Sequence, residues 1–143
     1  MINFQNVSKF YGDSSTALEE VSLKVDPGEF VCLVGKSGAG KSTMIKLLVG
    51  EEKPSKGRVF FGQYEVNKLN PKELPPFRRH VGVVFQDFKL LPMKNTYENV
   101  AFALEVAGRP QAEIRELVPQ VLDMVGLGEK LENFPHELSG GEK

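Results

Sequence analysis

An eight-residue glycine-rich run constrains the fold of this chain more than any other feature. Residues 35–42 read Gly-Lys-Ser-Gly-Ala-Gly-Lys-Ser, which fits the pattern of glycine, four residues, glycine, lysine and serine or threonine. A continuous apolar run at 30–34 precedes it, and a segment of helical composition at 41–49 follows it and is stopped by Gly50. A buried strand, a glycine-rich loop and a helix in that order predict an α/β fold with a phosphate-binding loop.

Each residue type in this run, called the phosphate loop below, suits a polyphosphate. Glycines let backbone N–H groups converge on an anion, and the positive end of the following helix dipole points to the same place. We expect Lys41 to bind the β- and γ-phosphates and the Ser42 hydroxyl to ligate Mg²⁺. The alternative is a glycine-rich turn with a chance lysine, which the flanking strand and helix disfavour. The predicted binding residues here are Gly35, Lys36, Ser37, Gly38, Ala39, Gly40, Lys41, Ser42 and Thr43.

The remaining periodicities predict strands first and helices afterwards. Alternation predicts strands near 2–4 and 20–25, another strand is predicted near 57–62, and a second buried-type strand is predicted at 81–85. Helices are predicted from Thr96 to a break at 108–110 and again over 111–125. Pro119 lies inside the second helix and is expected to kink or split it.

Composition limits the environment of the chain. The net charge of −1, from 18 basic and 19 acidic residues, gives no electrostatic footprint for nucleic acid or anionic lipid. Cys32 is expected to be a small buried hydrophobe, and a single cysteine suits a reducing compartment. Neither a signal peptide nor an apolar run of the roughly 18 residues needed to span a bilayer is visible. We therefore expect a cytoplasmic protein whose link to a membrane, if it has one, is a partner.

A second glycine motif lies at the end of the chain. Leu138 is followed by Ser139-Gly140-Gly141-Glu142, which alone predicts a polar loop or the N-cap of a helix. Downstream of a phosphate loop, it resembles the signature sequence of ABC-type ATPases. The resemblance covers essentially the whole chain and implies a P-loop NTPase core with an antiparallel β subdomain and a helical subdomain. It implies a partial ATP-binding domain over 1–143, divided into 1–86, 87–138 and 138–143, with the C-terminal part of the core missing.

The resemblance also implies roles for individual residues. Tyr11 resembles the aromatic residue that stacks on adenine, although a core tyrosine is the alternative. Gln86 resembles the glutamine that reaches Mg²⁺ and the attacking water, although it could be a polar residue that ends a strand. Lys41 and Gln86 are then the catalytic residues of the chain, and Ser42 and Gln86 its metal ligands. Four residues would bind the ATP held by a second copy of the chain: Ser139, Gly140, Gly141 and Glu142.

Residues 78–91 and 99–105 are similar to a bacterial cell-division branch of this family. That branch implies an ATP-binding subunit, with ATP and Mg²⁺ as cofactors, on the cytoplasmic face of the inner membrane. It also implies a homodimer that sandwiches ATP, and an integral membrane partner. The alternatives are a subunit of a lipoprotein-release or macrolide-export transporter, or a nucleotide-binding fragment without turnover. DNA-repair ATPases are discounted, because they place heptad coiled coils between the two motifs.

The family pattern extends beyond the signature. It continues with an aspartate for the Mg²⁺ shell, a glutamate as general base and a later histidine, none of which has a position before Lys143. Hydrolysis needs a deprotonated, oriented water as well as charge stabilisation. We therefore expect the 143-residue chain alone to be deficient in ATP hydrolysis and marginal in folding.

Overall fold

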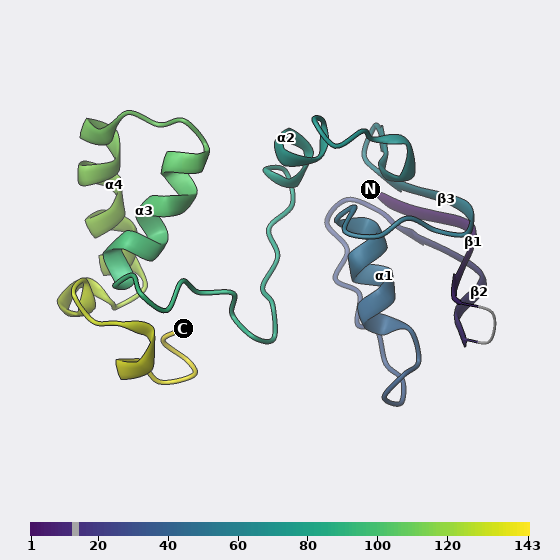
Figure 1. Cartoon of the computed structure of the whole chain (residues 1–143), viewed down its shortest axis with the longest axis horizontal. Helices are drawn as coiled ribbons and strands as arrows, with labels where there is room; N and C mark the ends of the chain where they lie inside the picture. Colours follow the sequence, from purple (N-terminus) through teal and green to yellow (C-terminus); the bar gives the residue numbers. More distant parts are fainter. Residues whose placement is uncertain (13–14) are drawn as a thin grey trace. The chain divides into compact units, whose positions relative to one another are not determined.

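The computed structural model describes residues 1–12 and 15–143, which divide into two compact units, Met1–Val83 and Val84–Lys143. Figure 1 shows the strands with α1 and α2 in the first unit, and α3 and α4 in the second. Each unit has its own cluster of buried apolar side chains, so each is described by itself.

The first unit is built on a four-stranded antiparallel sheet in the order β2-β1-β3-β4. The strands are β1 (Ile2–Tyr11), β2 (Ser15–Val25), β3 (Lys56–Phe61) and β4 (Tyr64–Glu65). The strands predicted near 2–4, 20–25 and 57–62 are confirmed. β1 and β2 are longer than predicted, because shifts of register on either side of Val7 let the pairing continue to Tyr11 and Ser15.

One helix, α1 (Lys41–Leu48), covers the core of this sheet. Leu47 is 1% exposed and packs in one cluster with Phe4, Val7 and Leu18 of the first two strands. Each such side chain contributes about 1.5–3 kcal/mol when it is fully buried. This packing sets the position of the N-terminal end of α1, where the phosphate loop lies.

The C-terminal end of α1 is held by α2 (Leu74–Arg78). Gly50 adopts a positive φ of 66°, as the predicted helix stop requires. The Arg78 guanidinium donates hydrogen bonds to the carbonyls of Val49 (2.9 Å) and Gly50 (3.0 Å). A cation on the last carbonyls of a helix also complements its dipole. Both ends of α1 are therefore fixed within the first unit.

The second unit is a helical hairpin of α3 (Thr96–Val106) and α4 (Gln111–Met124), as the periodicity predicted. Its core joins Ala101 of α3 to three residues of α4, namely Ile114, Val118 and Leu122. α4 runs through Pro119 and is not split, because burial of Val118 and Leu122 on either side outweighs one lost helical hydrogen bond.

Short helical turns join the longer elements. They are η1 (Val66–Lys68), η2 (Gly128–Lys130) and η3 (Pro135–Glu137). Within residues 1–12 and 15–143, no helix is both long and apolar enough to span a bilayer.

Two apolar segments predicted as buried strands form no strand. These are residues 30–34 and 81–85, in which Phe30, Val34 and Val84 are 95%, 92% and 94% exposed. A strand exists only through ladder hydrogen bonds to a neighbour, and β1 to β4 pair among themselves and with neither segment. The predicted burial of Cys32 is wrong for the same reason, because this residue is exposed.

Candidate functional site

The phosphate loop packs against β2 at Gly40. This residue is buried, has a φ of 84° and caps the N-terminus of α1 in a left-handed conformation. A Cβ atom here would lie 2.4 Å from the carbonyl oxygen of Ala17 and 2.7 Å from Cδ2 of Leu18. Only glycine fits this close approach, so the sequence pattern and the packing require the same residue.

Lys41 places its ammonium group over the loop. Its Nζ donates hydrogen bonds to the carbonyls of Gly35 and Lys36, each at 2.8 Å. The first turn of α1 contains no acidic residue, so no carboxylate of that turn neutralises the positive end of the helix dipole. The arrangement suits a polyphosphate, which would meet a cation and a helix N-terminus at one place.

Backbone donors and a hydroxyl complete the loop. The Met44 N–H donates to Gly40 C=O (2.9 Å), so the N–H groups of Lys41, Ser42 and Thr43 lie at the open end of the helix. Ser42 is exposed in this first turn. In the described part of the chain, no three His, Cys, Asp or Glu side chains gather as a metal site. A Mg²⁺ ion here fits a hydroxyl together with phosphate oxygens, which are the hard ligands it prefers.

Tyr11 lies at the end of β1 and is 40% exposed, so the alternative of a core tyrosine is wrong. Its hydroxyl donates to Glu52 Oε2 at 2.6 Å, and Lys9 Nζ lies 5.0 Å from its ring centroid. Tyr11 pairs with Ser15 at the start of β2, the strand that Gly40 approaches two residues further on. The fold therefore brings Tyr11 and the phosphate loop to the same end of β2.

Gln86 belongs to the second unit and is exposed in a turn. The turn closes with a hydrogen bond from Phe88 N–H to Phe85 C=O (3.0 Å), and Phe88 and Lys89 both have a positive φ. Lys89 binds the Asp87 carboxylate at 2.7 Å and thereby lowers the pKa of Asp87. Gln86 was predicted to lie at the end of a strand. The structure places it in a tight turn instead.

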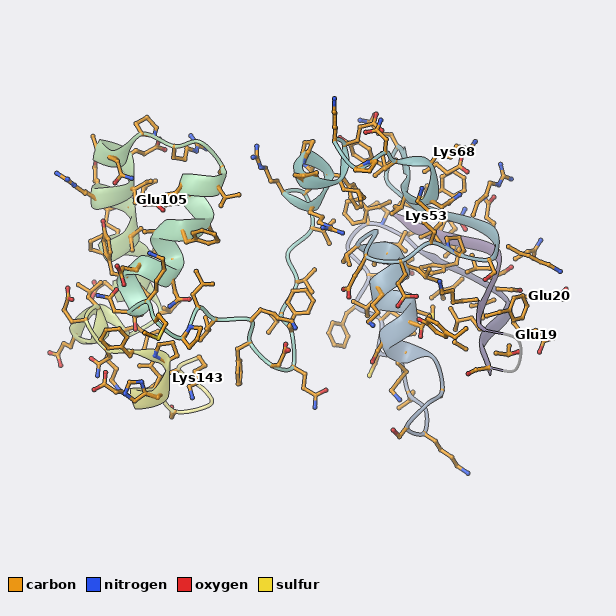
Figure 2. The ribbon with its side chains drawn as sticks, viewed as in Figure 1. Glu19, Glu20, Lys53, Lys68, Glu105 and Lys143 are labelled. Carbon is orange, nitrogen blue, oxygen red and sulfur yellow. The ribbon has the colours of Figure 1, made fainter. Side chains whose placement is uncertain are left out.

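The signature residues 139–142 form a turn that closes on itself. The N–H groups of Glu142 and Lys143 donate to Ser139 C=O at 3.1 and 3.2 Å, and Ser139 N–H donates to Glu142 Oε2 at 2.8 Å. Glu142 thus forms one half of a capping box, the arrangement that opens a helix. Gly140 and Gly141 are exposed beside it. Lys143, at the end of this turn, is labelled in Figure 2.

Lys130 of η2 holds the signature turn from outside. Its ammonium donates to Glu142 Oε1, and this bond, with the hydrogen bonds from Ser139, lowers the pKa of Glu142 to about 2. Neither Lys130 nor Glu52 was identified from the sequence. Each acts on a residue distant along the chain, so no local pattern could have indicated it.

Comparison with known proteins agrees with this geometry. The family model described as ABC transporter matches residues 18–143. The cell division ATP-binding proteins FtsE of Streptococcus pneumoniae and Bacillus subtilis are each 50% identical to the whole chain, and that of Escherichia coli is 46% identical. The chain spans 62–64% of the length of these relatives, which is less than two thirds.

Solved structures agree as well. A dimeric structure of the ABC transporter cassette MJ0796 is 36% identical, with a TM-score of 0.87. The same cassette in a post-hydrolysis state, bound to ADP and Pi, is 34% identical with the same TM-score. Each comparison covers 99% of this chain and 65% of the cassette, and the predicted ABC ATPase fold is confirmed. On the family match and on the cassette fold together, this chain belongs to the ABC transporter family of ATP-binding proteins.

Proposed function

We propose that the chain binds Mg-ATP in the phosphate loop as the ATP-binding subunit of an FtsE-type complex. The observation that carries the proposal is the position of the Lys41 ammonium, 2.8 Å from two loop carbonyls at the N-terminal end of α1. A triphosphate would replace these carbonyls as the partner of Lys41, and the opposite charges make that exchange favourable.

The first unit supplies the groups for one nucleotide. Loop N–H groups and those of the first turn of α1 hold the phosphates, and Lys41 bridges the β- and γ-phosphates. Ser42 provides a hydroxyl for Mg²⁺, and Thr43 lies beside it in the same turn. Tyr11, exposed at the same end of β2, offers a flat ring for adenine.

The second unit acts on a second copy of the chain. We propose that Ser139, Gly140 and Gly141 donate hydrogen bonds to the γ-phosphate bound by the phosphate loop of that copy, beside Glu142. The dimeric cassette structures of relatives support such a pairing. Gln86 is proposed to reach the Mg²⁺ ion and the attacking water, and to sense the membrane partner.

These residues contribute charge stabilisation to ATP hydrolysis. Lys41 and the loop N–H groups stabilise negative charge on the γ-phosphate as the transition state forms, and Gln86 orients the water. Mg²⁺ would neutralise charge on the phosphate oxygens. Hydrolysis also needs a general base, which none of these groups provides.

The partner and the location rest on the FtsE relatives. We propose an FtsX-like integral membrane protein as the partner, with this chain peripheral on the cytoplasmic face of a bacterial plasma membrane. ATP would favour the closed pair of copies and hydrolysis the open one, and this shift would move the partner in cell division.

The proposal is tested by the substitution Lys41→Ala. Loss of two charge-assisted contacts to phosphate is expected to weaken ATP binding about a hundredfold. The affinity is measured by titration with a fluorescent ATP analogue, with Lys72→Ala, an exposed lysine of the same unit, as the control. An unchanged affinity in Lys41→Ala would rule out the phosphate loop as the binding site.

A further inference from the structure

One carboxylate outside the phosphate loop is contacted by three side chains of the first unit, two from β1 and one from α1. Glu52 follows α1, next to Lys53, which is labelled in Figure 2. It accepts a hydrogen bond from the Tyr11 hydroxyl at 2.6 Å and lies 3.1 Å from Lys9 Nζ. Lys46 of α1 binds its other oxygen at 3.4 Å. The side chains of Glu52 and Lys9 are only 20% and 15% exposed, so solvent screens this group incompletely.

These contacts fix the orientation of the Tyr11 ring. An exposed tyrosine at the end of a strand ordinarily exchanges between rotamers. Here Glu52 holds the phenol end, while the Lys9 ammonium lies 5.0 Å from the ring centroid. The hydrogen bond from Tyr11, with those from Lys9 and Lys46, keeps the pKa of the Glu52 carboxyl below its usual range. The acceptor is therefore charged at neutral pH, which strengthens the bond to the phenol.

The Glu52 carboxylate is not needed to attach the loop after α1 to β1. Ser55 N–H donates to Ser8 C=O at 2.8 Å, and Ser55 Oγ accepts the N–H of Phe10 at 3.1 Å. Lys9 Nζ also donates to Lys53 C=O at 2.9 Å. The loop is therefore tied to β1 by several bonds without Glu52, and control of Tyr11 is the distinct consequence of its carboxylate.

We propose that Glu52 is a positioning residue that orients the Tyr11 ring for the nucleotide base, so that the contribution of the base to affinity depends on Glu52. The inference rests on the proposed binding of ATP and adds a residue that does not itself touch the nucleotide. Stacking on an aromatic ring is sensitive to the angle and offset of that ring. A ring held in advance loses less conformational entropy when the base binds.

The test compares a ligand with a base and a ligand without one. Affinities of the 143-residue chain for ATP and for inorganic tripolyphosphate are measured by competition with a fluorescent nucleotide analogue. Glu52→Ala is expected to weaken ATP binding about fivefold and to leave tripolyphosphate binding unchanged, since only ATP stacks. Glu52→Gln, which keeps an acceptor for the phenol, should restore most of the loss. Glu51→Ala, which removes the neighbouring carboxylate that pairs with Lys46 at 4.0 Å, is the control.

A cycle with Tyr11→Ala separates positioning from structural damage. With the ring absent, Glu52→Ala should have no further effect on ATP affinity, because the two changes remove the same contribution. A purely structural role would alter both ligands together, or would add to the effect of Tyr11→Ala, and either result overturns the proposal. If the unsubstituted chain binds neither ligand, the proposed function fails and this inference fails with it. If it binds ATP through Lys41 but Glu52→Ala keeps the wild-type ratio of affinities, only this inference fails.

Discussion

A single residue, Gly40, joins the motif to the fold. The sequence pattern requires glycine there for a turn around phosphate, and the structure adds a second requirement, because a Cβ atom at this position would lie 2.4 Å from the carbonyl oxygen of Ala17. The first requirement could be predicted from the spacing. The second could not, because it depends on α1 packing against β2. The same holds for Tyr11, whose partner Glu52 is 41 positions away.

Gly40→Ala is therefore expected to damage the first unit. The new methyl group would collide with Ala17 and Leu18 in a left-handed backbone conformation, which should lower the free energy of unfolding by about 2–4 kcal/mol. Gly38 has a φ of 81° but no atom within 4 Å of its Cβ position, so Gly38→Ala should cost only about 1 kcal/mol. Urea titrations of both variants give the comparison, and equal losses would argue against the packing described for Gly40.

At the scale of secondary-structure elements, the helices could be predicted from the sequence, because each depends on a local pattern. The first helix, bounded by the phosphate loop and Gly50, and the helices near 96–107 and 111–125 were found from periodicity and from glycine and proline. The segments 30–34 and 81–85 were predicted wrongly, because apolar composition indicates suitability for a buried strand but not the presence of a neighbour.

The start of α3 offers a test of local control. The Asn95 side chain accepts the Glu98 N–H at 2.8 Å, and the Glu98 carboxylate accepts the Asn95 N–H at 2.9 Å. Asn95→Ala should lower the free energy of unfolding of the second unit by about 1 kcal/mol, whereas Asn95→Ser should preserve most of it. Thermal unfolding followed by circular dichroism measures both. A serine variant as unstable as the alanine variant would show that this cap is not what holds the helix start.

The ion pair that holds the signature turn is expected to depend on pH. The pKa of Glu142 is lowered to about 2, chiefly by Lys130, from an ordinary value of 4.5. The pKa of Glu142 is lower in the folded chain than in the unfolded chain. The stabilisation from the Lys130–Glu142 ion pair is therefore complete above pH 4.5 and is lost as the pH falls towards 2. An NMR titration of the Glu142 carboxyl carbon should show the low midpoint, and Lys130→Ala should raise it. A midpoint near 4.5 in the unsubstituted chain would contradict the ion pair.

At the scale of the whole molecule, the two units carry complementary halves of the proposed ATP sandwich. The phosphate loop and Tyr11 lie in Met1–Val83, and Gln86 and the signature turn lie in Val84–Lys143. The family and its fold could be predicted from two glycine motifs and their order, and the comparisons confirm both. The predicted subdomain boundary at 86 stays a prediction, as do the roles of the site residues.

Ser139→Arg separates binding from pairing. The exposed position tolerates a long side chain in one copy, so ATP affinity at the phosphate loop of that copy should stay within about twofold of wild type. The same side chain would occupy the place of the γ-phosphate of the other copy, and ATP-dependent pairing should be lost. Gel filtration with and without ATP measures this, with Glu116→Arg on the exposed side of α4 as the control. A dimer that still forms with ATP would contradict the proposed contact.

The most direct test of the account is a crystal structure of this chain with Mg²⁺ and a non-hydrolysable ATP analogue. The account predicts phosphates surrounded by the N–H groups of residues 35–43, with Lys41 Nζ moved from the carbonyls of Gly35 and Lys36 to the phosphate oxygens. A nucleotide bound elsewhere, with Lys41 still on those two carbonyls, would contradict it.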